Sequence, residues 1–156
     1  GRGENARGIL AAIDTSYAYI EFDLSGQVQS ANRNFLQLMG YQADEVVGKH
    51  HRMFVQPSES ASHAYAQFWR DLGNGQAQNA VFKRITKAGA EVWIQAVYAP
   101  VKDEMGRVVK VVKIATDVTA QVTANMMLIG RVTGGRVDYA YREDQQRSAL
   151  LRFKQR

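Results

Sequence analysis

The chain has 156 residues, of which 46% are hydrophobic and 22% charged, so it has room for one well-buried globular domain and a short appendage. Cysteine is absent, which excludes disulfides, thiolate metal sites and cysteine nucleophiles. No apolar run approaches the roughly 18 to 20 residues of a membrane span and no signal-peptide core opens the sequence, so we expect a cytoplasmic protein without a membrane span.

The formal charge of +5 is concentrated at one end of the chain. Residues 131–156 hold seven of the 20 basic residues but three of the 15 acidic ones. The rest of the chain is nearly neutral, so no nucleic-acid partner is expected. The sequence leaves open whether this basic tail is a solvated helix, an anion-binding arm or non-native sequence.

The first half of the chain predicts a β-hairpin followed by short helices. Residues 17–23 alternate as a strand does, and a Ser-Gly turn leads to a second strand at 28–32. Asn32 stands where a helix N-cap belongs, and Gly40 where that helix ends. Apolar residues at helical spacing then predict a helix over 58–72.

The second half predicts three longer strands, at 79–86, 91–101 and 108–118, joined by short turns. Strands joined in this way form an antiparallel meander with one face packed on the core. The expected order is therefore two strands, several short helices, three strands and a helix.

Four segments in this order carry a resemblance to a known family. Together they resemble PAS domains, most of all those of bacterial methyl-accepting chemotaxis (energy-taxis) receptors and tandem-PAS biofilm-dispersal proteins; the segments are "ANRNFLQLMGY", "DEVVGK", "FWRDLGNG" and "FKRITKAGAEVWIQAVYAPVKDEMGRVVKVVKIATDVT". The resemblance implies an α+β PAS fold. Its five-stranded antiparallel sheet has the order 2-1-5-4-3, with short helices over one face and a C-terminal exit helix.

The resemblance also divides the chain. Residues 1–9 are expected to be an N-terminal extension or cap, and residues 10–119 the PAS sensor domain. Residues 120–130 are the exit helix, and 131–156 are a basic tail of unclear origin.

Asp117 and Thr119 are the predicted signalling residues. They match the Asp-hydrophobic-Thr motif that ends the last PAS strand, from which a helix leads to the next module. At such a junction they can accept hydrogen bonds from free N–H groups of the first helical turn and so fix the exit angle. The alternative is a plain N-cap without a signalling role.

The resemblance implies that the pocket can hold a cofactor, and haem b is one candidate. His63 lies where haem-binding PAS sensors carry the histidine that ligates the iron. The alternative is an ordinary exposed or capping histidine. His50 and His51 are adjacent but have no further ligands at suitable spacing, so no metal site is expected there.

FAD is the favoured cofactor if there is one, because the sequence shares its layout with flavin-binding PAS redox sensors. Asn32, Asn34, Trp69 and Trp93 are then the expected contacts, since amides and aromatic faces can hold an isoalloxazine ring. Core packing is the alternative for both tryptophans. The flavin-adduct chemistry of photoactive PAS domains is excluded because it needs a cysteine.

No nucleophile elbow or phosphate-binding loop is present, so the chain is not expected to be an enzyme. The predicted function is a sensory module of a chemotaxis-type receptor. It reads a redox, gas or small-molecule cue in its pocket and passes it through the last strand to the exit helix and a downstream module. The alternative is a cofactor-free dimerisation or protein-interaction module. A homodimer through the exit helix or the N-terminal segment is expected in either case. A pocket filled by aromatic side chains favours the alternative.

Overall fold

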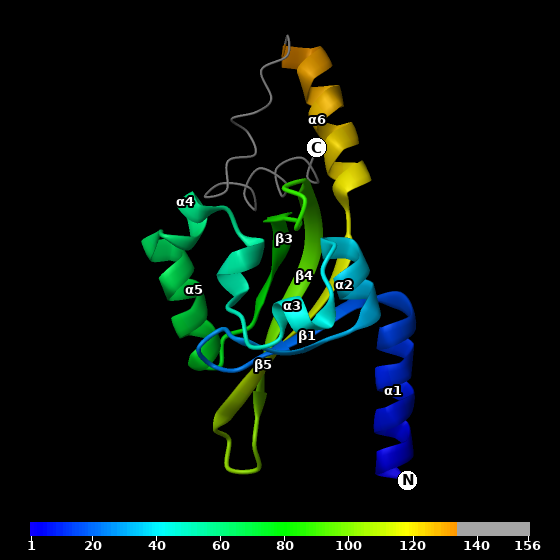
Figure 1. The fold of residues 1–156 in the computed structure, drawn as a ribbon, viewed down its shortest axis with the longest axis vertical. Coiled ribbons are helices and arrows are strands. Elements are labelled where there is room, and N and C mark those ends of the chain that lie inside the picture. Colours follow the sequence, from blue (N-terminus) through cyan, green and yellow to red (C-terminus); the bar gives the residue numbers. More distant parts are fainter. Residues whose placement is uncertain (134–156) are drawn as a thin grey trace.

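The computed structural model describes residues 1–133, which form a sheet, a set of short helices and two longer terminal helices (Figure 1). The elements are α1 (Arg2–Ser16), β1 (Ala18–Phe22), β2 (Val28–Ala31), α2 (Arg33–Met39), α3 (Ala43–Val46), the 3-10 helix η1 (His51–Phe54), α4 (Pro57–Ser60), α5 (His63–Gly73), β3 (Gln78–Ile85), β4 (Glu91–Lys102), β5 (Val108–Asp117) and α6 (Thr119–Thr133).

The five strands form one antiparallel sheet in the order β2-β1-β5-β4-β3, so the predicted fold and strand order are confirmed. The short helices cover one face, where residues from α2, α3, η1 and α5 join residues from the strands in the main core. The alternation of β4 places Ile94, Ala96 and Tyr98 in this core and turns Trp93 to the opposite face.

The helix boundaries follow local capping. The Oδ1 atom of Asn32 accepts the N–H of Phe35 at 2.9 Å, and Gly40 ends α2 in the left-handed conformation at φ 80°, as the sequence predicts. The predicted single helix over 58–72 is wrong, because the chain forms α4 and α5. Pro57 begins α4, and the Ser62 hydroxyl accepts the N–H of Tyr65 at 3.1 Å, which starts a new helix.

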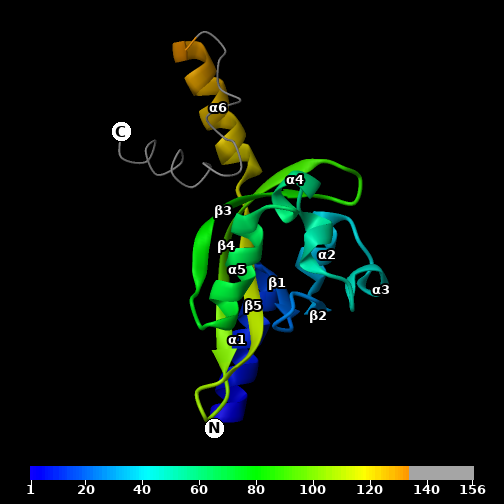
Figure 2. The same cartoon turned by 90° about the vertical axis from the view of Figure 1, so that its left-hand side faces the viewer.

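Helices α1 and α6 extend from the body in opposite directions, as both views show (Figure 2). The predicted extension 1–9 belongs to α1, which has no buried residue, and the predicted exit helix 120–130 lies within α6. Most of the predicted basic tail lies outside the described residues. Within residues 1–133, none of the helices combines the length and apolar character needed to cross a bilayer.

Candidate functional site

A buried histidine lies at the centre of the helix-covered face. The His51 side chain is fully buried at the start of η1. Its Nδ1 atom lies 2.7 Å from the hydroxyl of Tyr65 on α5, and its Nε2 atom lies 2.8 Å from the hydroxyl of Tyr98 on β4. Three elements far apart in the sequence therefore meet at one imidazole ring.

The hydrogen bonds around His51 join two phenols and one cation. Arg84 on β3 donates from Nη2 to the Tyr98 hydroxyl at 3.2 Å, because a guanidinium can only donate. In either tautomer the neutral imidazole donates to one of the two tyrosine hydroxyls and accepts from the other.

Burial keeps the imidazole neutral. It lowers the pKa of His51 well below its ordinary value, and the nearby positive charges of Arg84 and Lys113 act in the same direction. Burial raises the pKa of Tyr98, against the opposing effect of Arg84, and raises the pKa of Tyr65 to about 12. Both phenols are therefore protonated at neutral pH and can donate and accept hydrogen bonds.

Two buried cations adjoin this group. Arg84 is 2% exposed and donates from Nη1 to the Lys83 carbonyl at 2.9 Å and to Glu59 at 3.3 Å. Burial acts to lower the pKa of Arg84, but Tyr98 and Glu59 outweigh it and raise the value. Lys113 is 1% exposed, and its Nζ atom lies 4.9 Å from the ring centroid of Tyr98. Burial, followed by the charge of Arg84, lowers the pKa of Lys113 well below its ordinary value.

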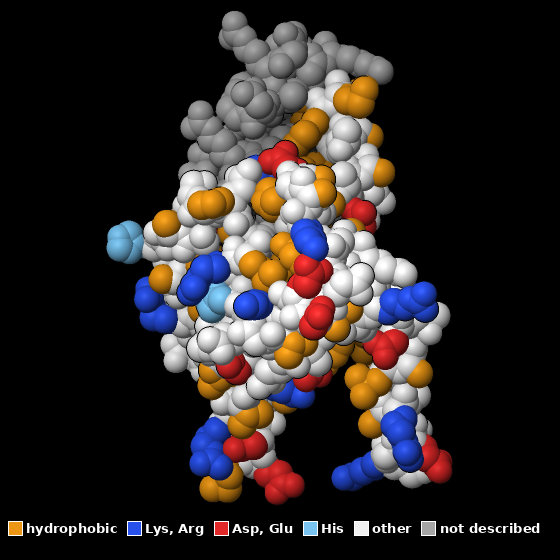
Figure 3. Space-filling view, viewed as in Figure 1, with side chains coloured by type: hydrophobic (Ala, Val, Ile, Leu, Met, Phe, Trp, Pro, Cys, Tyr) orange, Lys and Arg blue, Asp and Glu red, His pale blue; other side chains and the backbone are white. Residues whose placement is uncertain are grey.

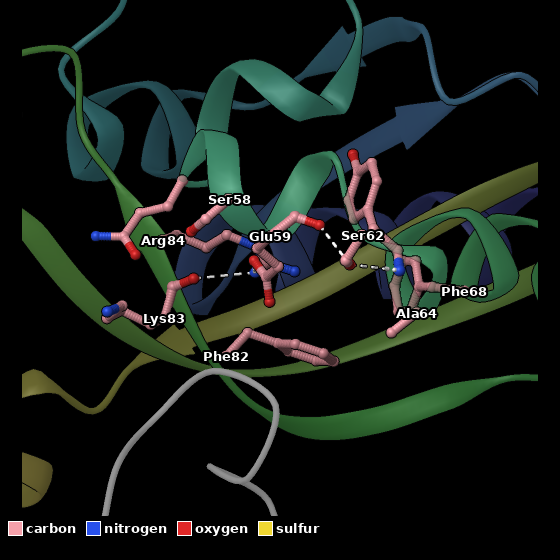
Figure 4. A pocket seen from close by; sticks show the side chains of 10 residues that line it. Ser58, Glu59, Ser62, Ala64, Phe68, Phe82, Lys83 and Arg84 are labelled. Atoms are coloured by element: carbon pink, nitrogen blue, oxygen red, sulfur yellow. Dashed lines mark hydrogen bonds and ion pairs between the residues drawn. The ribbon is translucent and has the colours of Figure 1, made fainter. Parts of the chain in front are cut away.

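A pocket of about 550 Å³ lies beside this cluster, between α4 and α5 on one side and β3 on the other. Figure 4 shows the side chains of Glu59 and Arg84 together in the pocket, with the Phe82 ring beneath them. The lining is apolar at Ala64, Phe68 and Phe82, and polar at Gln56, Ser58, Glu59, Ser62, Tyr65, Lys83 and Arg84.

A continuous chain of contacts therefore links the pocket to the core and returns to it. The chain runs from Glu59 through Arg84, Tyr98 and His51 to Tyr65, which itself lines the pocket. A change of partner at Glu59 or Arg84 alters the hydrogen bonds available to the others.

Sequence reasoning missed this cluster. It considered His51 only as part of a metal site, and within residues 1–133 no group of three or more possible metal ligands exists. A usable signal lay in β3, where alternation puts Arg84 on the same strand face as Phe82. A cation on a face that otherwise packs into the core needs buried partners.

The predicted cofactor residues do not come together. Asn32 and Asn34 fasten α1 to the body, because both side-chain amides donate to the Tyr17 carbonyl, at 2.9 and 3.0 Å, and both also bond to Asp14. His63 is exposed at the start of α5 and does not line the pocket.

The two tryptophans lie on different faces of the sheet. Trp69 packs with the helix-covered core, at 5.4 Å from Phe22 and 5.3 Å from His51 between ring centroids. Trp93 is 5% exposed on the opposite face, with Val81 and Val122. The five predicted residues therefore form no common FAD or haem b site in this structure.

Asp117 and Thr119 form a compact joint between the sheet and α6. Asp117 accepts the N–H of Thr119 at 2.9 Å and its hydroxyl proton at 2.6 Å. The Thr119 Oγ1 atom accepts the N–H of Trp93 at 2.9 Å, and Val118 donates its N–H to the Trp93 carbonyl at 2.8 Å. The base of α6 is thus bonded to the backbone of β4 as well as continuing β5.

Comparison with known proteins agrees with this architecture. A family model described as the PAS fold matches residues 12–115. The biofilm dispersion protein BdlA of Pseudomonas aeruginosa is 44% identical over 111 residues, which are 71% of this chain and 27% of that protein. The aerotaxis receptor of Escherichia coli is 30% identical over 82 residues, which are 53% of this chain and 16% of the receptor.

A solved structure of an RNA-binding light-oxygen-voltage receptor superposes with a TM-score of 0.68 at 28% identity, over 81% of this chain and 36% of that one. The chain thus spans about a quarter or less of the two curated relatives and about a third of this receptor structure. With the family match over two thirds of its length and the sheet order observed here, the chain belongs to the PAS family.

Proposed function

We propose that this chain is a non-catalytic, cytoplasmic sensory module of a chemotaxis-type receptor. Its input is a small molecule in the pocket between α4, α5 and β3, and its output is the placement of α6. Strand β4 is the observation that carries the proposal, because it contributes Tyr98 to the buried cluster and Trp93 to the joint beneath α6.

The path between the two is short. Arg84 pairs across the sheet with Val92, and the adjacent Lys83 pairs with Trp93. A shift of Arg84 in the pocket therefore acts on β4 next to the residue whose backbone holds Thr119. Such a shift becomes a change in the tilt of α6 because α6 begins at Thr119.

The relatives support a sensory role. One is named a biofilm dispersion protein and the other an aerotaxis receptor, and the second name denotes a receptor. FAD and haem b remain predictions from sequence, whereas the pocket supports a polar small molecule. The downstream signalling module would lie in the part of a longer receptor that this chain does not include.

Hydrogen–deuterium exchange in α6 tests the proposal. Arg84→Gln disturbs the pocket end of the path, and we expect amide exchange in the first two turns of α6 to change by several-fold. Thr119→Val removes the side-chain contact with Trp93 and should abolish that response. Arg107→Gln, in the exposed β4–β5 turn, is the matched control. Unchanged α6 exchange in Arg84→Gln would contradict the relay.

A second candidate is the cofactor-free interaction module that pairs with another copy of the chain. Exposed apolar side chains on both terminal helices favour it: Ile9 and Leu10 on α1, and Met127 and Leu128 on α6. Figure 3 shows hydrophobic side chains on the outer surfaces of both helices. Sedimentation analysis of Leu128→Gln and Leu10→Gln distinguishes the two helices. The substitution in the helix that forms the dimer interface should yield a monomer, and the other substitution should leave the dimer intact.

A further inference from the structure

The pocket contains a buried cation whose hydrogen-bonding capacity is only partly used. Arg84 lines the pocket and is 2% exposed, and its Nε atom meets no partner among residues 1–133. Its carboxylate partner, Glu59, is held through Nη1 at 3.3 Å, a long contact for a charge-assisted hydrogen bond. A guanidinium can form two parallel hydrogen bonds to a well-placed carboxylate. Glu59 does not form such a bidentate pair, because it bonds to the Nη1 atom of Arg84 alone.

Glu59 is placed where it can leave this contact. It lies on the four-residue helix α4, which packs mainly on α5, and its side chain is 21% exposed, compared with 3% for Arg84. A rotation of the Glu59 side chain toward solvent restores its hydration, whereas the Arg84 guanidinium is held by the Lys83 carbonyl and the Tyr98 hydroxyl. The anion is therefore the exchangeable member of the pair.

The pocket wall favours a flat apolar group next to the anion. The Phe68 and Phe82 rings lie 6.0 Å apart at 76°, and the Arg84 guanidinium carbon lies 4.8 Å from the Phe82 centroid. Lys83, the other cation of the lining, is bonded to Glu91 at 3.1 Å. A ligand that enters here meets an aromatic wall with one buried positive charge at its end.

We propose that the pocket takes a small carboxylate with a flat apolar body, and that the carboxylate of the ligand replaces Glu59 on Arg84. The inference rests on the proposed use of this pocket as the input. Because one carboxylate replaces another, the buried guanidinium is not left without a counter-ion, which would carry a large energetic cost. Glu59 acts as the internal partner of Arg84 when no ligand is bound.

The exchange also explains how binding reaches the sheet. Arg84 donates simultaneously to the pocket anion and to Tyr98, so a carboxylate that draws the guanidinium into a bidentate contact changes the Arg84–Tyr98 bond. Tyr98 lies on β4, five residues from Trp93. Ligand class and relay thus depend on the same side chain.

Isothermal titration of the full chain with benzoate tests the ligand class, with benzamide as the uncharged probe of matched shape. We expect benzoate to bind with a dissociation constant on the order of 1 mM and benzamide to bind at least tenfold more weakly. Equal binding of the two probes, or no binding of benzoate, overturns the proposal.

Two substitutions test the exchange. Glu59→Gln removes the competing charge, so benzoate should bind about tenfold more tightly if Glu59 occupies Arg84 about nine-tenths of the time. Arg84→Met should abolish the preference for benzoate, and Lys83→Met, the matched cation control, should change its affinity by less than about threefold. If Arg84→Met does not fold, Glu59→Gln alone decides: unchanged or weaker benzoate binding in that variant overturns the exchange.

The two proposals fail in different ways. If benzoate binds as expected but Arg84→Gln leaves amide exchange in α6 unchanged, the carboxylate site stands and the relay fails. If benzoate does not bind while Arg84→Gln still changes α6 exchange, the relay stands and the carboxylate site fails.

Discussion

The two faces of the sheet are built on different principles. The helix-covered face buries His51, Arg84 and Lys113 among aromatic rings, and their positions depend on specific hydrogen bonds and ring contacts. The opposite face has a small apolar cluster of Trp93, Val81 and Val122 under the start of α6. Polar groups in a core make packing sensitive to what binds nearby, whereas an apolar cluster holds a helix without such dependence.

On the helix-covered face, the proposed relay requires a change at Arg84 to pass to Tyr98 and His51 through the hydrogen bonds that join them. On the other face the side chain of Trp93 holds α6 by burial, while its backbone bonds to Thr119 and Val118 set the angle. Substitutions on the two faces should therefore differ in kind as well as in size.

The largest effect is expected from Trp93→Ala. Loss of this nearly buried indole should lower the free energy of unfolding by about 3–4 kcal/mol and speed amide exchange along α6, because the helix loses the surface on which it packs. Denaturant melts and hydrogen exchange measure both. Trp69→Ala, on the helix-covered face, should destabilise the domain without the same loss of protection in α6; equal loss in both variants would remove the distinction between the faces.

Tyr98→Phe should cost about 2 kcal/mol, because it leaves Nε2 of His51 and one N–H of Arg84 without their partner in the core. Tyr65→Phe is the matched control, since it removes a hydroxyl that serves His51 alone among the bonds of this cluster. Chemical denaturation should rank Tyr98→Phe as the more damaging change. The reverse ranking would mean that the cluster is not centred on Tyr98.

Lys113→Met tests the same face of the sheet, but here the substitution is expected to raise the free energy of unfolding. Burial penalises this ammonium, and aromatic rings face it where a carboxylate is usual, so a methionine of similar length should raise stability at pH 7 by about 1 kcal/mol. Lys110→Met, which removes a partly exposed partner of Glu21, should bring no such gain. A loss of stability in Lys113→Met would show that the contacts of the ammonium with the aromatic rings outweigh the cost of its burial.

A dependence on pH follows from His51. Its pKa is lowered in the folded protein, so below about pH 6.5 the unfolded chain binds a proton that the folded protein does not. Stability from this group is present above that pH and declines as the pH falls, by about 1 kcal/mol between pH 7 and pH 5.5.

The comparison that isolates this effect is wild type against His51→Gln, followed by thermal melts at both pH values. The difference between the two proteins should shrink toward the acid side. A constant difference between wild type and His51→Gln would show that the imidazole does not titrate in this window.

The fold was predictable because its signals are local. Alternation marked the strands, and the Asn32 cap and the Gly40 stop marked α2. The split between α4 and α5 was missed because the apolar residues that mark the helix, from Tyr65 to Leu72, all lie in α5, while the break depends on one serine that caps this second helix.

The candidate site was not predictable in the same way. His51, Arg84 and Tyr98 come from three elements that only the folded sheet brings together. Alternation did place Trp93 and Tyr98 on opposite faces, but only the structure shows that Trp69 packs on the face of Tyr98 and so lies apart from Trp93. The amide side chains of Asn32 and Asn34 were predicted to contact a cofactor, but they bond to the Tyr17 carbonyl and attach α1 to the domain.

The attachment of the two terminal helices has a mechanical consequence. Helix α1 ends just before β1 and α6 begins just after β5, and these strands are neighbours in which Ala18 pairs with Ala115. The shortest bonded route between the helices is therefore the contact between these two adjacent strands. In a protein assembled from several such units, a twist would pass from helix to helix through one strand pair per unit, with the pocket at β3 separated from that pair by β4.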